Sequence, residues 1–285
     1  MKLLILGATG MAGHAVALYM KEKGYDVITI SRKPFLYCEN IICDLYNNHS
    51  KLKKIINDGN FTTIINCVGI LNNNAESNKH EAVFLNSYLP HYISDITKKS
   101  DTKVIHMSTD CVFSGKTGNY SEDSPKDGAT FYDISKSLGE LNNGKDLTFR
   151  NSIIGPDTNI NGIGLFNWFM SQNGRIKGYT QTIWTGVTTL TLAKAIEKAI
   201  KNNLCGIYHL VNGNTISKYD LLCLFNRYFK NEIIDIIKDS SVKVDKSLIN
   251  NRKDFSFNFL SYEEMISEMK NWIYSHKELY PHYFY

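Results

Sequence analysis

The chain has 285 residues, enough for one large domain or two small ones, and a formal net charge of +4. With 43% hydrophobic residues, it can form a packed core, so a wholly disordered chain is excluded. The small basic excess does not indicate a nucleic-acid-binding protein, although it suits an anionic small ligand.

No targeting or membrane-spanning segment is expected. The first apolar run stops at Gly7, before the length of a signal-peptide core is reached. No run of about 18 apolar residues occurs elsewhere, so no membrane partner is expected. The six cysteines contain no CxxC pair and the histidines show no metal-ligand spacing, which favours free thiols and no bound metal. We therefore expect a cytoplasmic protein.

The first half of the chain alternates short apolar segments with longer amphipathic ones. Strands are expected at residues 2–6, 26–30, 62–68, 103–107 and 147–154, and helices at residues 11–23, 80–99 and 131–141. This alternation predicts parallel strands joined by crossover helices, an α/β Rossmann fold with a doubly wound parallel sheet. The strands read as nearly continuous apolar runs because such a sheet is buried on both faces.

The pattern changes after Gly155. Helices are expected at residues 165–170, 189–201, 217–229 and 262–275, a strand at 207–211, and a polar loop at 239–258. No clear linker separates the two parts. We expect a cofactor-binding domain over residues 1–155, which also receives parts of 180–212. A smaller α/β substrate-binding region over 156–285 would be interleaved with it.

Three glycines follow the first expected strand and open the first helix. At the spacing of Gly7, Gly10 and Gly13, one allows a sharp turn, one allows a pyrophosphate to approach the backbone, and one allows close packing of helix and strand. The helix N-terminus then offers N–H donors to the phosphates. The expected dinucleotide contacts here are Gly7, Thr9, Gly10, Met11, Gly13 and, after a later strand, Cys67, Val68 and Gly69.

The end of the second strand bears on which dinucleotide binds. A carboxylate there would bind the ribose 2′-hydroxyl of NAD, but the chain has Ser31-Arg32-Lys33 instead. Arg32 suits a 2′-phosphate, with Ser31 as a hydroxyl donor, so NADP(H) is preferred and NAD(H) remains open. Asp44 could accept a hydrogen bond from the adenine amino group or cap a turn.

Tyr132 and Lys136 lie four residues apart and therefore share one helix face. An ammonium group beside a phenol favours the phenolate and would lower the pKa of Tyr132 toward the range useful to an acid catalyst. The pair Tyr19–Lys23 has the same spacing but lies away from the carboxyl ends of the strands, so we interpret it as chance.

Thr109 ends the strand expected at residues 103–107, between Ser108 and Asp110. A hydroxyl at this place can hydrogen-bond a substrate carbonyl oxygen and share in proton transfer with Tyr132. A polar strand end alone would mean little. The glycine turn, the hydroxyl and the Tyr–Lys helix in this order are together much more specific.

These motifs resemble the extended short-chain dehydrogenase/reductase family. Residues 108–115, STDCVFSG, are most similar to the dTDP-4-dehydrorhamnose reductase (RmlD-type) branch, whose pattern there is close to STDYVFDG. The resemblance implies NADPH-dependent reduction of the C4 keto group of a nucleotide-linked 4-keto-6-deoxyhexose, for surface polysaccharide synthesis. Thr109 would bind the carbonyl oxygen, Tyr132 would donate the proton and Lys136 would bind the nicotinamide ribose. Members of the family often dimerise, so a homodimer is possible.

The resemblance also suggests substrate contacts, which include departures from the branch pattern. Asp110 and Cys111 border the expected sugar pocket, Arg150 or Lys177 would lie near the diphosphate, and Trp184 near the sugar or base. Related dehydratases carry Asp-Glu after the threonine, whereas Cys111 follows Asp110 here, so reduction is favoured over dehydration.

Two alternatives remain open from the sequence. A nucleotide-sugar epimerase would retain its dinucleotide and consume no free NADPH. A non-catalytic, dinucleotide-binding regulatory subunit similar to that of methionine adenosyltransferase would act through a partner enzyme. The presence of both Tyr132 and Lys136 argues against a purely regulatory role.

Overall fold

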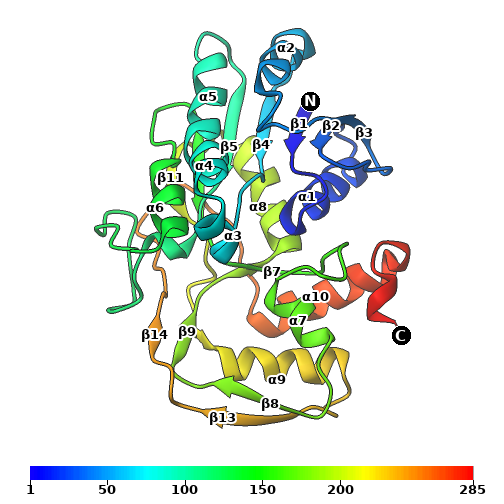
Figure 1. The fold of residues 1–285 in the computed structure, drawn as a ribbon, viewed down its shortest axis with the longest axis vertical. Helices are drawn as coiled ribbons and strands as arrows, with labels where there is room; N and C mark the ends of the chain where they lie inside the picture. The colour runs from blue at the N-terminus through cyan, green and yellow to red at the C-terminus, as the bar shows by residue number, and fades with distance from the viewer. Residues whose placement is uncertain (285) are drawn as a thin grey trace.

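The computed structural model describes residues 1–284 and is built around one seven-stranded sheet (Figure 1). Its strands are β1 (Lys2–Leu6), β2 (Asp26–Ser31), β3 (Glu39–Ile42), β4 (Thr63–Asn66), β5 (Lys103–Met107), β6 (Leu147–Arg150) and β11 (Gly206–His209). Their order is β11-β6-β5-β4-β1-β2-β3, and all neighbours are parallel. The predicted doubly wound Rossmann sheet is therefore confirmed.

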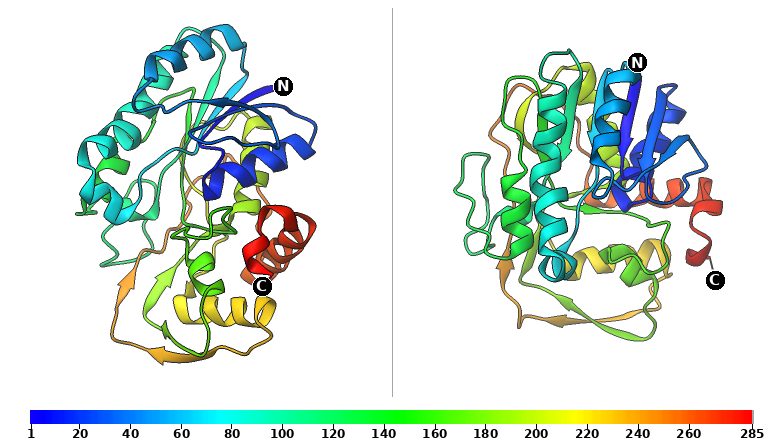
Figure 2. Two further views of the ribbon diagram at one scale, coloured as in Figure 1. Left: turned by 45° about the vertical axis from the view of Figure 1, so that its right-hand side comes forward. Right: turned by 45° about the horizontal axis from the view of Figure 1, so that its top comes forward.

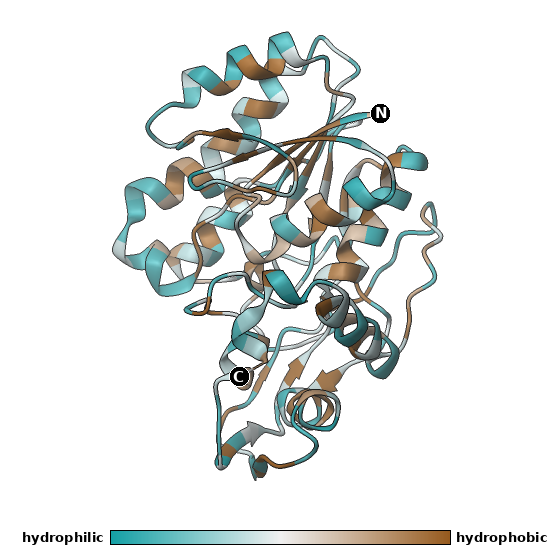
Figure 3. Cartoon of the chain, turned by 90° about the vertical axis from the view of Figure 1, so that its right-hand side faces the viewer, coloured by the Kyte–Doolittle hydropathy of each residue, from teal (hydrophilic) through white to brown (hydrophobic). Residues whose placement is uncertain are grey.

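Helices cover both faces of this sheet. On one face lie α1 (Met11–Glu22) and α8 (Thr189–Lys201), which pack against each other. On the other lie α2 (His49–Gly59) and α5 (Leu89–Ile96). Successive residues of β1 alternate between the two cores: Leu3 and Ile5 pack into the first, and Leu4 and Leu6 into the second. The apolar strands between the inward faces of the helices are visible in Figure 3.

Two predicted elements differ in detail. The helix expected at residues 80–99 consists of α4 (Lys79–Ala82), a π-helical segment η1 (Val83–Tyr88) and α5. The strand expected at 147–154 is broken, because the chain leaves the large sheet after Arg150. Its second part, β7 (Ile153–Ile154), pairs with β10 (Val187–Thr188) in a separate two-stranded sheet.

A smaller lobe lies beyond the carboxyl ends of the large sheet (Figures 1 and 2). Its helices are α7 (Leu165–Met170), α9 (Lys218–Phe229) and α10 (Tyr262–Ser275). Strand β8 (Arg175–Tyr179) pairs with β13 (Asp235–Asp239), and β9 (Thr182–Trp184) lies between β12 (Ile216–Ser217) and β14 (Val244–Asp245). The short strand β14 falls in the segment that the sequence predicts to be a loop. No helix within residues 1–284 is both long and apolar enough to cross a membrane.

Candidate active site

The site begins where the order of the strands reverses. The chain runs from β1 outward through β2 and β3, and then returns to β4 on the opposite side of β1. Doubly wound sheets bind ligands in the crevice at the carboxyl ends of the strands at such a switch point. Gly7 follows β1 here, and Cys67, Val68 and Gly69 follow β4.

The turn between β1 and α1 requires glycine at two positions. Gly7 has a φ of +85°, a left-handed conformation that side chains rarely adopt. A Cβ atom on Gly13 would lie 2.1 Å from the carbonyl oxygen of Gly7, so only glycine permits this approach. The first N–H groups of α1 have no side-chain cap, which leaves donors available for a phosphate. The turn therefore fits the diphosphate of a dinucleotide.

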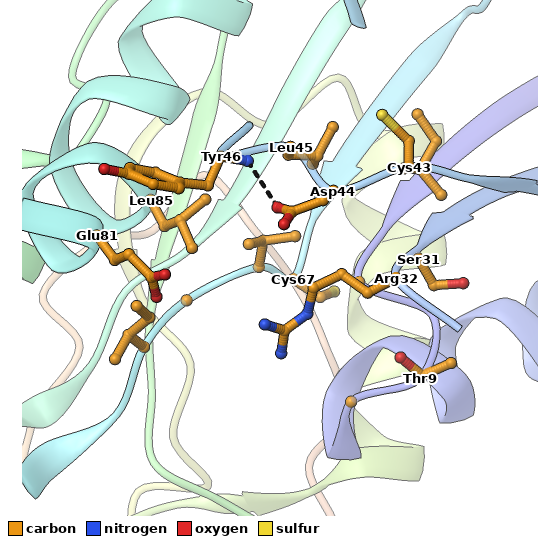
Figure 4. A pocket seen from close by; sticks show the side chains of 16 residues that line it. Thr9, Ser31, Arg32, Cys43, Asp44, Leu45, Tyr46, Cys67, Glu81 and Leu85 are labelled. Carbon is orange, nitrogen blue, oxygen red and sulfur yellow. Dashed lines mark hydrogen bonds between the residues drawn. The ribbon is translucent and has the colours of Figure 1, made fainter. Parts of the chain in front are cut away.

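A pocket opens beside this turn (Figure 4). The predicted cofactor residues that line it are Gly7, Thr9, Gly10, Ser31, Arg32, Asp44, Cys67, Val68 and Gly69. Met11, Gly13, Tyr132 and Lys136 do not line it. Leu45, Tyr46, Glu81 and Leu85 also line it and were not predicted, because they belong to loop and helix segments without a motif.

The side chains of Arg32 and Ser31, the two predicted contacts to the 2′-phosphate, have different surroundings. Arg32 is exposed and directs its side chain into the pocket (Figure 4). The hydroxyl of Ser31 instead donates to the carbonyl oxygen of Lys33 at 2.7 Å and accepts from Asn40 Nδ2 at 2.8 Å. The Ser31 hydroxyl therefore stabilises its own turn, and because Ser31 also lines the pocket, its predicted contact with a 2′-phosphate stays a prediction.

Asp44 performs the turn-capping role that the sequence left open. Its Oδ1 accepts from the backbone N–H of Tyr46 at 3.0 Å, and its Oδ2 accepts from Asn47 Nδ2 at 2.7 Å. The same carboxylate lines the pocket, so capping does not remove it from a bound ligand.

Thr109 lies directly after β5 and begins the 3₁₀ turn η2 (Asp110–Val112). Its hydroxyl accepts from the N–H of Cys111 at 3.1 Å and donates to Asp110 Oδ1 at 3.1 Å. These bonds determine the direction of the hydroxyl, which is buried next to Tyr132 and opposes the rise in the pKa of that phenol.

Tyr132 and Lys136 lie on the buried face of α6 (Phe131–Leu138), as the spacing predicts. A capping box of Thr130 and Asp133 starts this helix. Burial raises the pKa of Tyr132, and the nearby groups of Cys111 and Asp110 raise it further. The expectation that Lys136 lowers this pKa is therefore wrong for the structure: desolvation dominates and keeps the phenol protonated.

The ammonium group of Lys136 points toward the sheet. Its Nζ donates to the carbonyl oxygen of Met107 at 2.6 Å and lies 3.4 Å from Nε2 of His106, a fully buried histidine. Burial lowers the pKa of Lys136 to about 8, although Glu140 and Cys67 oppose this. A Cβ atom on Gly69 would lie 3.9 Å from Nζ. The Tyr–Lys helix thus adjoins the crevice where the dinucleotide fits.

Asn86 holds α6 against the end of β4, a role the sequence did not predict. Its side chain accepts from the N–H of Ile70 at 2.8 Å and donates to the Ser135 hydroxyl at 3.0 Å. The available signal was that Asn86 falls between Ala82 and Leu89 on the apolar face of the expected helix, where a polar side chain needs a partner.

Two lysines of the smaller lobe place positive charge near Asp110, the residue after Thr109. Asp110 is buried, which raises the pKa of its carboxyl group, while Lys246 and Lys218 lower it. Both lysines come from the smaller lobe, so the predicted substrate residues Asp110 and Cys111 lie between the two parts of the chain. No group of three or more potential metal ligands occurs among residues 1–284.

Arg150 does not lie where a diphosphate could reach it. It is 2% exposed, and its Nε and Nη2 donate to the two carboxylate oxygens of Glu140 at 2.7 and 2.9 Å. A third bond, from Nη1, goes to the carbonyl oxygen of Glu122 at 3.0 Å. Contrary to expectation, Arg150 stabilises the core, because a buried guanidinium needs a paired carboxylate.

Two other expected substrate contacts also have structural roles. Lys177 is exposed on β8 and pairs with Asp239 at 3.1 Å, on the outer ribbon of the smaller lobe. Trp184 is 3% exposed, packs against Tyr262, and has the Nζ of Lys218 5.4 Å from its ring centroid. Trp184 therefore packs inside the protein and does not present its ring to a sugar or base.

Comparisons with known proteins agree with this arrangement. The family model described as the RmlD substrate binding domain matches residues 1–241. The spore coat polysaccharide biosynthesis protein SpsK of Bacillus subtilis is 26% identical over 224 residues, 77% of this chain and 76% of that protein. Methionine adenosyltransferase 2 subunit beta of Xenopus laevis is 25% identical over 237 residues, 77% of this chain and 70% of that protein.

A solved structure shares the fold. The dTDP-4-dehydrorhamnose reductase of Bacillus anthracis, in complex with NADP, superposes with a TM-score of 0.77 and 20% sequence identity. The alignment covers 94% of this chain and 99% of that chain.

The structural role of Arg150 can be tested by its removal. Arg150→Met leaves the buried Glu140 without its main partner, so we expect the free energy of unfolding in urea to fall by about 3–5 kcal/mol. Lys126→Met is the matched control, because Lys126 pairs with the same carboxylate from a more exposed position and should cost less than about 1 kcal/mol. A stable Arg150→Met protein that has lost substrate affinity would contradict the assignment.

Proposed function

The chain belongs to the RmlD substrate binding domain family, and from this premise we propose that it is an NADPH-dependent nucleotide-sugar 4-ketoreductase. The substrate would be a nucleotide-linked 4-keto-6-deoxyhexose, similar to dTDP-4-dehydrorhamnose. The convergence of Thr109, Tyr132 and Lys136 beside the glycine-lined crevice carries this proposal. The name of SpsK, a polysaccharide biosynthesis protein, supports a role in making surface sugars.

Each of these three residues has a distinct task in the proposed reaction. When bound, the nicotinamide supplies the hydride to C4. In this reaction the Thr109 hydroxyl turns its single proton from Asp110 Oδ1 to the C4 oxygen and so orients the sugar. Tyr132 gives its phenolic proton to the same oxygen as negative charge develops there, and its raised pKa keeps that proton present near neutrality. Lys136, above Gly69, binds the ribose next to the nicotinamide.

The residues around Thr109 favour reduction over related reactions. Elimination of water from the sugar needs a second carboxylate next to Asp110, and Cys111 occupies that place. Burial raises the pKa of the Cys111 thiol to about 12, so it is not a substitute base. An epimerase would regenerate its own dinucleotide, and a regulatory subunit like the methionine adenosyltransferase relative would need no proton donor.

The proposal predicts which substrates consume NADPH. Purified protein should oxidise NADPH with at least one nucleotide-linked 4-keto-6-deoxyhexose. The reaction is measured as the loss of NADPH absorbance. Tyr132→Phe should lower kcat by about 10²–10⁴-fold with NADPH binding retained, because only the proton donor is lost.

Tyr19→Phe is the matched control for that substitution. Tyr19 belongs to the second Tyr–Lys pair, and its hydroxyl donates to Glu197 at 2.7 Å, far from the crevice. The Tyr19→Phe variant should therefore have the same kcat as the wild type. The proposal would be contradicted if none of the nucleotide-linked 4-keto-6-deoxyhexoses causes NADPH oxidation, or if Tyr132→Phe is as active as the wild type. Epimerisation of the sugar without loss of NADPH would favour the epimerase.

The lowered pKa of Lys136 predicts a pH dependence. The ammonium is charged below about pH 8 and neutral above it, so kcat/KM should fall as the pH rises through this value. Lys136→Arg should move the fall to higher pH, because a guanidinium stays charged. A wild-type profile that stays flat well above pH 8, or an unchanged profile in the arginine variant, would contradict this role.

The position of Arg32 in the pocket predicts that the protein prefers NADPH to NADH. Arg32→Ala should raise the KM for NADPH about tenfold or more and leave that for NADH unchanged, because only NADPH carries a 2′-phosphate. The neighbouring Lys33→Ala is the control, since Lys33 does not line the pocket. An equal rise in the KM for NADPH and for NADH would show that Arg32 stabilises the pocket but does not bind the 2′-phosphate.

A further inference from the structure

A row of buried polar side chains leads from the end of β4 to Lys136. Asn66 of β4 and His106 of β5 are partners in the register of the sheet, and both are fully buried. The Nδ2 of Asn66 lies 3.2 Å from Nδ1 of His106, and Nε2 of His106 lies 3.4 Å from Nζ of Lys136. The row therefore ends at the lysine that we assign to the nicotinamide ribose.

The orientation of the Asn66 amide follows from its other hydrogen bond. Its Oδ1 accepts from the backbone N–H of Val68 at 3.1 Å. A backbone N–H can only donate, so the amide oxygen faces Val68 and the amide nitrogen faces His106. Because this nitrogen is a donor, Nδ1 of His106 has to accept and carries no proton.

The single proton of the imidazole is therefore on Nε2. Burial lowers the pKa of His106 well below its usual value, and the nearby Lys136 and His91 lower it further, so the ring is neutral. In a neutral imidazole, the bond made by one nitrogen determines whether the other carries the proton. With Nδ1 occupied by Asn66, the N–H of the ring is directed at Nζ of Lys136.

This N–H opposes a positive charge on Lys136. An ammonium group has three N–H donors and no acceptor, so it presents a donor to the donor of His106. The neutral amine has a lone pair that can accept from Nε2–H, while its own N–H still donates to the carbonyl oxygen of Met107. The hydrogen bonding of His106 therefore favours the amine, in the same direction as the desolvation of Lys136.

The other titratable groups around Lys136 come from β4 and α6. Glu140, just after α6, favours the ammonium, although its carboxylate is also held in a buried ion pair. Burial raises the pKa of the Cys67 thiol to about 12, so it is uncharged near neutrality, and Tyr132 keeps its phenolic proton. His106 is thus a neutral neighbour that can change the protonation of Lys136 by a change of its own tautomer.

We propose that Asn66 and His106 are positioning residues that hold the imidazole proton on Nε2 and thereby set, through Lys136, the upper pH limit of the reaction. The inference deepens the proposed function and rests on it, because the pH limit has meaning only if Lys136 serves a bound dinucleotide.

Asn66→Asp is the substitution that should reverse this arrangement. One carboxylate oxygen can still accept from the N–H of Val68, but the other now accepts from His106. The imidazole proton then moves to Nδ1, and the lone pair on Nε2 accepts from the Lys136 ammonium. The change is nearly isosteric, so the packing of the two strands is retained.

The tautomer can be measured without substrate, by NMR of the full chain labelled with ¹⁵N in its histidines. His106→Phe identifies the His106 signals among those of the eight histidines. We expect the proton on Nε2 in the wild type and on Nδ1 in Asn66→Asp. A wild-type protein with the proton on Nδ1 would overturn the inference.

The consequence for Lys136 is measured by NMR titration of ¹³Cε-labelled lysine and by the pH profile of kcat/KM. Lys136→Arg identifies the Lys136 signal by its loss. In Asn66→Asp, we expect both the Lys136 midpoint and the fall of kcat/KM to move up by about one pH unit or more. A purely structural role would lower kcat/KM at every pH and leave the midpoint unchanged, and that result would overturn the inference.

The double variant Asn66→Asp/His106→Phe separates the tautomer from the added charge. It keeps the new carboxylate but has no imidazole, so the midpoint of Lys136 should equal that in His106→Phe alone. A midpoint that stays raised would show that the carboxylate acts directly on Lys136 and would contradict the inference. Where the double variant does not fold, the wild-type tautomer decides the question.

The two NMR measurements also separate this inference from the proposed function. If no 4-keto-6-deoxyhexose causes NADPH oxidation, the proposed function fails, while the NMR results still show whether His106 controls the protonation of Lys136. If NADPH is oxidised but the imidazole proton is on Nδ1 in the wild type, the inference alone fails.

Discussion

The reversal of strand order between β3 and β4 is the constraint on which the site depends. It separates β2 from β4 on the two sides of β1 and opens a crevice at their carboxyl ends. Gly7 and Gly13 allow the backbone to line this crevice, and Lys136 reaches its edge above Gly69. The dinucleotide pocket and the proton donor therefore adjoin because of topology, although Gly7 and Tyr132 lie more than a hundred positions apart in the chain.

Burial then sets the protonation state of the site. It raises the pKa of Tyr132, lowers that of Lys136 to about 8, and lowers that of the adjacent His106 well below its usual value. A buried phenol is poorly suited to act as a base but retains the proton that a reduction consumes. Tyr132 is therefore in the protonated form that the proposed reduction requires, and the N–H of Cys111 holds the hydroxyl oxygen of Thr109 beside it.

The sequence predicted the elements with strong periodicity and the residues that belong to local motifs. The first strand, the helix at 189–201 and the helix at 262–275 were predicted at their observed bounds, because each has a continuous apolar face. Contacts between distant segments were not predictable. Arg150 is paired with Glu140 from a loop, and the short strand β14 that carries Lys246 toward the site has no pattern of its own. The functional role of a charged side chain depends on its partners, which only the fold supplies.

Transfer of deuterium from NADPH labelled at C4 of the nicotinamide tests the central claim most directly. Wild-type protein would be incubated with the labelled NADPH and a nucleotide-linked 4-keto-6-deoxyhexose, and the sugar product analysed by mass spectrometry and NMR. The account predicts one deuterium at C4 of the product for each NADPH oxidised when the label is on the transferred face. A product without deuterium from either labelled face, or a rearranged sugar formed without NADPH oxidation, would contradict it.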